Sequence, residues 1–135
     1  MPVTAADQPS PAAEAGPRIL VIDDDALQIM AHAMMLEDWG YRPVLARDAA
    51  EALRQLVAEP PDLLICDYLL AGGVTGPRVV EQVRAACGRT IPALFVTGIG
   101  GAAPLAEIAA VGGIVVAKPF DLNELRRTIA TLLAA

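Results

Sequence analysis

The chain has few cysteines and little positive charge, and both shortages exclude classes of protein. Its two cysteines, Cys66 and Cys87, have neither the spacing of a metal site nor the number of a disulfide framework, which favours a reducing, cytoplasmic location. The 10 basic residues against 16 acidic ones give a net charge of -6 without any basic cluster, so we expect neither a nucleic acid nor a membrane surface as partner. No apolar run approaches the roughly 18 residues of a membrane span, and the N-terminus lacks the pattern of a signal peptide.

What the sequence does contain is an alternation of short aliphatic runs with longer, helix-length segments. The first 17 of the 135 residues are rich in proline and alanine, which predicts a disordered tail (1–17) before one domain (18–135). Aliphatic runs without polar alternation predict parallel strands buried on both faces. The expected strands are Ile19–Ile22, Val44–Ala46, Leu63–Cys66, Ala93–Val96 and Ile114–Ala117. The expected helices are Ala26–Trp39, Ala49–Ala58, Pro77–Cys87, Pro104–Val111 and Leu122–Leu133. The pattern predicts an α/β fold, a doubly wound five-stranded parallel sheet of the (βα)5 type.

Polar residues stand where four of the expected strands end. Asp23 and Asp24 follow the first strand, Asp67 the third, Thr97 the fourth and Lys118 the fifth. Because the carboxyl ends of parallel strands lie along one edge of a sheet, we expect these side chains to converge in one crevice.

The residue types at this edge predict phosphoryl chemistry. Three carboxylates facing one lysine leave a negative site that Mg²⁺ would neutralise, with water and substrate oxygens completing its shell. A carboxylate beside Mg²⁺ can attack phosphorus and become an aspartyl phosphate. The charge on the transferring group would be stabilised by Mg²⁺, Lys118 and the Thr97 hydroxyl. Asp25 stands outside this set, and we interpret it as the N-cap of the following helix.

Four motifs carry a family resemblance. In order, "ILVIDDDAL", "DLLICDYLLAGGVTG", "PALFVTG" and "AKPF" resemble the receiver domain of two-component response regulators, over about residues 17–133. The resemblance implies a flavodoxin-like sheet with strand order 2-1-3-4-5. It also implies a signalling switch rather than an enzyme acting on other molecules, with a histidine kinase or a histidine phosphotransfer protein as its partner.

The same resemblance assigns roles to individual residues. It implies that Asp67 is the phosphoacceptor, that Thr97 and Lys118 contact the phosphoryl group, and that the Lys118–Pro119 peptide bond is cis. The implied metal ligands are Asp67, Asp24, the backbone carbonyl of Leu69 and, through a bound water, Asp23.

Two departures from the usual receiver pattern concern switching and hydrolysis. Val115 stands three residues before Lys118, where receivers usually carry the aromatic ring that turns inward on phosphorylation. The motif "FVTGIG" is similar to the FATGUY subgroup, which also lacks that ring, and "DYLLAGGVTG" resembles receivers that work with hybrid histidine kinases. Leu69 and Ile99 are apolar at two positions that flank the phosphoryl group and are often polar. We therefore expect a long-lived phosphorylated form.

The first expected helix is apolar on nearly every side. Helical spacing places Leu27, Ala31, Met35, Leu36 and Trp39 toward the core. It leaves a set of apolar residues near the outer side, namely Ile29, Met30, Ala33 and Met34. An exposed apolar patch marks a partner surface, which would be the docking face for the kinase or a homodimer contact, unless the last helix or the tail covers it. His32 in this helix is interpreted as a half-buried spectator in preference to a phosphodonor.

The sequence leaves alternatives open. No segment follows the last helix, so output is expected through protein contacts, unless the chain is a fragment of a larger protein. A phosphatase of the haloacid dehalogenase type would use Asp23 as nucleophile and Asp25 as general acid. A degenerate receiver would act as a constitutive binding module. Turnover of a phosphomonoester would indicate the phosphatase, and a single stoichiometric phosphorylation the receiver.

Overall fold

The computed structural model describes residues 16–56 and 59–135, so all but the last two residues of the predicted tail (1–17) lie outside the described residues. Within the described part, five parallel strands form one sheet in the order β2-β1-β3-β4-β5, as the resemblance implies. The strands are β1 (Arg18–Ile22), β2 (Arg42–Ala46), β3 (Leu63–Cys66), β4 (Ala93–Thr97) and β5 (Ile114–Ala117). The helices are α2 (Ala26–Asp38), α3 (Ala49–Gln55), α4 (Gly76–Cys87), α5 (Ala102–Ala110) and α6 (Leu122–Ala134), with a short 3-10 helix, η1, at Ala71–Gly73.

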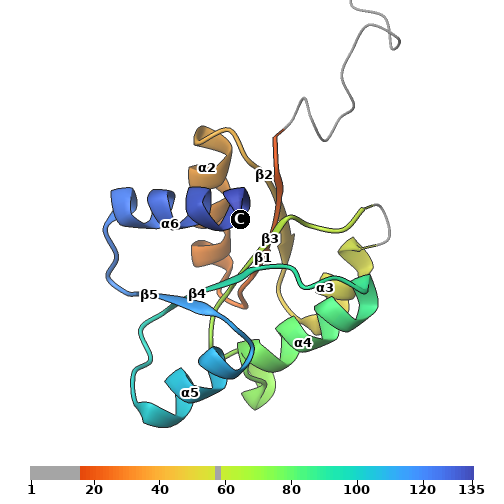
Figure 1. Ribbon diagram of the computed structural model, residues 1–135, viewed down its shortest axis with the longest axis vertical. Helices are drawn as coiled ribbons and strands as arrows, with labels where there is room; N and C mark the ends of the chain where they lie inside the picture. The colour runs from red at the N-terminus through yellow and green to blue at the C-terminus, as the bar shows by residue number, and fades with distance from the viewer. Residues whose placement is uncertain (1–15, 57–58) are drawn as a thin grey trace, which may run out of the picture.

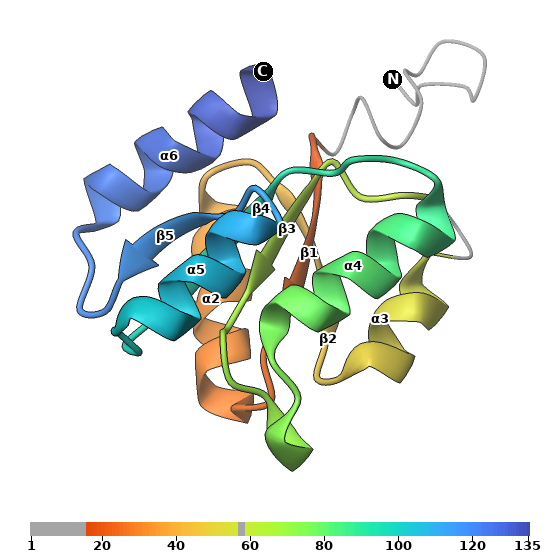
Figure 2. The same ribbon diagram turned by 60° about the horizontal axis from the view of Figure 1, so that its bottom comes forward.

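Helices cover both faces of the sheet (Figure 1). The helices α2 and α6 lie on one face and α3, α4 and α5 on the other, and Figure 2 shows the two layers with the sheet between them. Each layer of helices packs against the sheet around a separate apolar core. Strand β1 contributes to both cores, because Ile19 and Val21 point to one face of the sheet and Leu20 and Ile22 to the other. Among the described helices, none is long and apolar enough to cross a membrane.

The prediction that every strand is buried on both faces is correct only for the central strands. All residues of β1, β3 and β4 are buried, whereas β2 is half-buried and Ile114 of β5 is 43% exposed. The difference follows from position, since β2 and β5 are the edge strands of the sheet. It also explains how β2 begins at Arg42 and includes Pro43, because proline is tolerated in edge strands.

Helix ends follow local capping. The Asp25 carboxylate accepts hydrogen bonds from the main-chain N–H groups of Leu27 (2.9 Å) and Gln28 (3.1 Å), which confirms its interpretation as the N-cap of α2. Helix α3 ends at Gln55, earlier than predicted, and the last two residues of the predicted span, 57–58, lie outside the described residues. Helix α5 begins at Ala102, two residues before the predicted proline start.

The orientation predicted for α2 is only partly correct: Leu36 is buried and Met35 and Trp39 pack against the core as predicted, but Leu27 and Ala31 are exposed. The buried residues are Ile29, His32, Ala33 and Leu36, whereas Leu27, expected in the core, is 83% exposed. Ile29 (4% exposed) and Ala33 (7%) therefore do not belong to the predicted outer patch, although Met30 (54%) and Met34 (66%) are exposed as predicted. The cause is that α2 has apolar residues on all sides, so periodicity does not select a face, and its one histidine lies on the buried side.

Candidate functional site

The sheet brings the strand-end residues together. The main-chain N–H of Asp67 donates to the carbonyl of Ile22 (3.1 Å), so Asp67 at the end of β3 lies beside Asp23 at the end of β1. The N–H of Lys118 donates to the carbonyl of Thr97 (2.9 Å), which pairs the ends of β4 and β5 in the same way. The predicted convergence of carboxylates, hydroxyl and ammonium at one edge is therefore a property of the strand register.

Asp67 and Lys118 face each other across the crevice. The Asp67 Oδ1 atom accepts the N–H of Tyr68 at 2.8 Å, and Oδ2 lies 3.8 Å from the Lys118 Nζ atom. Both side chains keep contact with solvent, with exposed fractions of 18% and 25%. The Lys118–Pro119 peptide bond is cis, as the resemblance implies. A carboxylate oxygen and an ammonium group are thus held close together and open to a small anionic reactant.

Asp23 is the buried member of the carboxylate group, with an exposed fraction of only 2%. Burial raises the pKa of the Asp23 carboxyl above its ordinary value, and the negative charges of Asp67 and Asp24 add to the effect. The N–H of Asp25, which donates to Asp23 Oδ1 at 2.9 Å, acts in the opposite direction. Asp24, in contrast, is exposed at the rim. A cation placed here would relieve the electrostatic cost of an ionised Asp23.

The donor set fits Mg²⁺. Leu69 and Thr75 form an isolated antiparallel bridge after β3. The two hydrogen bonds of this bridge are made by the flanking residues, from the Gly76 N–H to the Tyr68 carbonyl and from the Leu70 N–H to the Val74 carbonyl. The Leu69 carbonyl takes part in neither of them. In the described part of the chain, no three histidine, cysteine or acidic side chains form a complete metal cage. Mg²⁺ prefers one or two carboxylate ligands and keeps several waters in its shell. The residues at this edge offer the carboxylates and one main-chain carbonyl, and the open crevice leaves room for the waters.

Thr97 is buried at the end of β4, with an exposed fraction of 1%. Its Oγ1 atom accepts the N–H of Ile99 at 3.1 Å, which fixes the turn that follows the strand. Because a hydroxyl that accepts one bond still has a proton to donate, Thr97 can donate to a further oxygen.

A family model described as the response regulator receiver domain matches residues 19–130. The chain belongs to the response regulator receiver family. The receiver is 31% identical over 118 residues to the phosphate regulon transcriptional regulatory protein PhoB of Escherichia coli (strain K12), and 30% identical over 117 residues to the transcriptional regulatory protein ZraR of the same organism. Each match covers 86% of this chain but only 51% of PhoB and 26% of ZraR. The chain therefore spans about half the length of one relative and a quarter of the other.

Solved structures agree with this membership. The chemotaxis protein CheY4 of Vibrio cholerae superposes with a TM-score of 0.76 at 27% identity, over 86% of this chain and 98% of that one. A two-component response regulator from Clostridium difficile gives a TM-score of 0.79 at 24% identity, over 88% of this chain and 97% of that one, which shows the shared fold.

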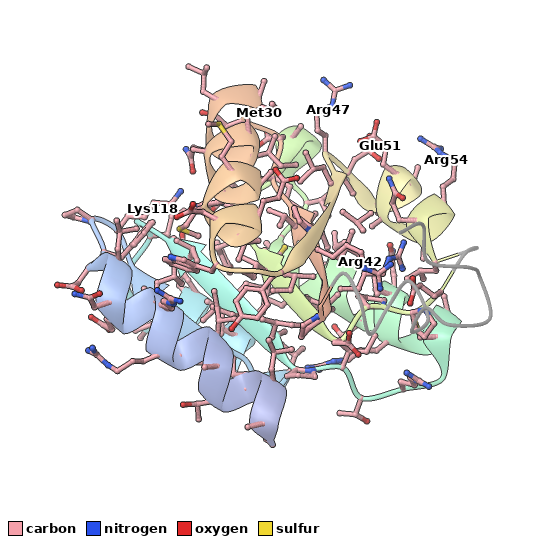
Figure 3. The ribbon with its side chains drawn as sticks, turned by 90° about the horizontal axis from the view of Figure 1, so that it is seen from above. Met30, Arg42, Arg47, Glu51, Arg54 and Lys118 are labelled. Atoms are coloured by element: carbon pink, nitrogen blue, oxygen red, sulfur yellow. The ribbon has the colours of Figure 1, made fainter. Side chains whose placement is uncertain are left out.

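Gln28 is a site residue that sequence reasoning missed. Its Oε1 atom accepts a hydrogen bond from the Lys118 ammonium, so the first turn of α2 contacts the end of β5. The available signal was its place three residues after the N-cap Asp25, at the end of the helix nearest the crevice. Figure 3 shows Lys118 beside α2, with Met30 on the same helix.

A second missed group ties the loop after Asp67 to α5. The Tyr68 hydroxyl donates to Glu107 Oε1 at 2.6 Å, and the Thr75 hydroxyl donates to Glu107 Oε2 at 2.5 Å. Val115, where an aromatic ring is usual, is half-buried against the core that contains Phe95. No spacing in the sequence relates Tyr68 to Glu107, so only the fold could reveal this contact.

His32 is more deeply buried than predicted, with an exposed fraction of 8%. Burial and the positive charge of Lys118 lower the pKa of the imidazole below its ordinary value. Its ring lies 6.2 Å from the Phe120 ring, and a groove of about 660 Å³ runs beside both, between α2 and the loop that leads into α6. The lowered pKa favours the neutral imidazole, so His32 lies beside the site as a packed, uncharged side chain.

Proposed function

We propose that this receiver is a phosphorylation-dependent switch of a two-component or phosphorelay system in which Asp67 accepts a phosphoryl group from a phosphohistidine. The observation that carries the proposal is the Asp67 carboxylate at the open edge of the sheet, with the Lys118 ammonium 3.8 Å away and Asp23 buried beside it. An Asp67 oxygen would form the bond to phosphorus as the phosphorus–nitrogen bond of the donor breaks, and the pair of electrons would leave on the imidazole.

The residues around Asp67 would divide the work. Mg²⁺ would be held by Asp24, Asp67 and the Leu69 carbonyl, and by Asp23 through a water, and when bound it would neutralise charge on the phosphoryl oxygens. Lys118 would pair with a phosphoryl oxygen, and Thr97 would donate its hydroxyl proton to another. Movement of Thr97 would carry the turn at Ile99 with it and bias the surface of α5 and β5 between two states.

The proposal extends to partners. A histidine kinase or a phosphotransfer protein would dock on the exposed side of α2, where Leu27, Met30 and Met34 are apolar and solvent-facing. A homodimer through the same residues is the rival. Absence of the aromatic ring at Val115 and the "FVTGIG" motif favour the FATGUY-like or hybrid-kinase-associated receivers, and we place the receiver domain at residues 18–135 and the protein in the cytoplasm.

Lifetime is part of the same proposal. Leu69 (50% exposed) and Ile99 (36%) flank the crevice without a polar group to orient a hydrolytic water. The phosphorylated form should therefore be long-lived, and the Leu69→Asn/Ile99→Glu double variant should lose its phosphoryl group faster than the wild type. An unchanged or slower loss, measured by intact mass over time, would contradict this part.

The deciding experiment is intact mass after incubation with acetyl phosphate, with and without Mg²⁺. We expect a Mg²⁺-dependent gain of one phosphoryl group in the wild type and none in Asp67→Asn. Asp38→Asn, which changes an exposed aspartate of α2, is the matched control and should behave as the wild type. No gain in the wild type would point instead to a constitutive binding module. Repeated turnover of a phosphomonoester would point to the phosphatase, although the Asp25 carboxylate is already engaged in capping α2.

A further inference from the structure

The ammonium group of Lys118 has two polar contacts, one with Asp67 and one with Gln28. Its Nζ atom lies 3.8 Å from Asp67 Oδ2 and donates a hydrogen bond to Gln28 Oε1. The ammonium is therefore held from α2 and stands beyond direct hydrogen-bonding distance of the carboxylate. The space between Lys118 and Asp67 is where the proposed function requires a phosphoryl oxygen.

The Gln28 amide is oriented from its other end. Its Nε2 atom lies 3.4 Å from Asp25 Oδ2, and its main-chain N–H donates to Asp25 Oδ1. Since an amide has one end that accepts and one that donates, this arrangement places Oε1 toward Lys118 and Nε2 toward Asp25. The third aspartate of the "DDD" run thus does more than cap α2: it fixes the side chain that holds the lysine.

The chemistry of glutamine suits this task. A lysine side chain has a long flexible stem, and in this crevice Asp23, Asp24 and Asp67 all attract its ammonium. A neutral acceptor can hold the ammonium without cancelling its charge, whereas a carboxylate at position 28 would add a fourth negative group to the site. Gln28 is also half-buried, so its own position is restricted by packing.

We propose that Gln28 is a positioning residue for phosphoryl transfer, which holds Lys118 at the distance from Asp67 that leaves room for a phosphoryl oxygen. The inference rests on the proposed function. The inference can be tested separately from that function, because Gln28 already contacts Lys118 in the structure without a phosphoryl group.

The test uses the fact that Lys118 is the only lysine of the chain, so lysine-labelled protein gives the NMR signals of one side chain. In the wild type, we expect separate shifts for the two Hε protons of a restricted Lys118. In Gln28→Met these shifts should collapse, and phosphorylation by acetyl phosphate should slow about tenfold, which corresponds to 1.36 kcal/mol at the transition state. Gln28→Glu keeps an oxygen acceptor and should restore the separate shifts. Gln82→Met, on the exposed side of α4, should change neither reading.

Two results would overturn the inference. The first is a Lys118 signal that stays the same in Gln28→Met, since a merely structural glutamine would leave it so. The second is a collapsed signal together with a wild-type rate of phosphorylation, which would mean that holding Lys118 does not serve the reaction. A wild type that takes up no phosphoryl group would overturn the proposed function and this role with it, whereas the lysine signals would still show whether Gln28 holds the ammonium.

Discussion

Replacing Gly76 with alanine should damage both the stability and the site of this receiver. Gly76 begins α4 and lies against the end of β3. A Cβ atom at this position would stand 2.2 Å from the carbonyl oxygen of Asp67, 2.9 Å from the Sγ of Cys66 and 3.0 Å from the Cε1 of Phe95. The first of these atoms is main chain, so it cannot turn away as a side-chain end could. Helix α4 and the Asp67 peptide must separate.

The size of the effect follows from two opposing contributions. Overpacking in a well-packed region costs about 1–3 kcal/mol, and contact with a main-chain atom places this case at the upper end. Alanine gains up to about 1 kcal/mol over glycine in a helix, and less in its first turn. We therefore expect Gly76→Ala to lower the free energy of unfolding by about 2 kcal/mol.

Urea unfolding followed by the fluorescence of Trp39, the only tryptophan, measures this change. Gly100→Ala is the matched control, because its added Cβ would have nothing within 4 Å, and it should stay within about 0.5 kcal/mol of the wild type. Gly76→Ala should also be phosphorylated more slowly than the wild type, since the carbonyl that it displaces belongs to Asp67. Equal unfolding free energies for the two variants would refute the reasoning.

Three further predictions concern buried titratable groups. Asp23→Asn keeps the oxygen that accepts from Asp25 but removes a desolvated charge, so in Mg²⁺-free buffer at neutral pH its free energy of unfolding should rise by about 1 kcal/mol while phosphorylation by acetyl phosphate falls. Because the pKa of His32 is lowered in the folded state, its stabilising contribution should be complete above about pH 6.5 and lost as the pH falls through the folded pKa; imidazole NMR signals that titrate at or above the ordinary value would contradict this. Burial raises the pKa of the Cys66 thiol well above its ordinary value, so a thiol reagent should label Cys87 alone in the native receiver and both cysteines in urea, as mass spectrometry would show.

The sequence predicts the fold well because its strands are marked by composition alone. Apart from Arg18 at the start of β1, the three central strands are apolar runs, and the polar residue at the end of each one also places the site, since strand register carries Asp23 and Asp67 to the same edge. Edge strands are harder to delimit, because β2 includes a proline, which a central strand would exclude.

Prediction failed where the pattern holds no contrast. Every side of α2 offers apolar residues, so nothing in the sequence shows that Ile29 and Ala33 face the core while Leu27 faces solvent. Gln28 was missed for a different reason: its partner Lys118 is 90 residues away in the sequence, and only the folded sheet brings the two together.

The contact between Tyr68 and Glu107 bears on the missing aromatic ring in the same way. Tyr68 donates its main-chain N–H to Asp67 and its hydroxyl to α5, so one residue joins the carboxylate of the site to the helix beyond it. In receivers with the usual ring, the element that moves is the side chain on β5; here that position carries Val115, a half-buried aliphatic side chain without a ring. The hydrogen bond between Tyr68 and Glu107 connects the loop after β3 to α5 without an aromatic ring on β5. The connection depends on three-dimensional proximity rather than on residue spacing, so a sequence motif alone does not reveal it.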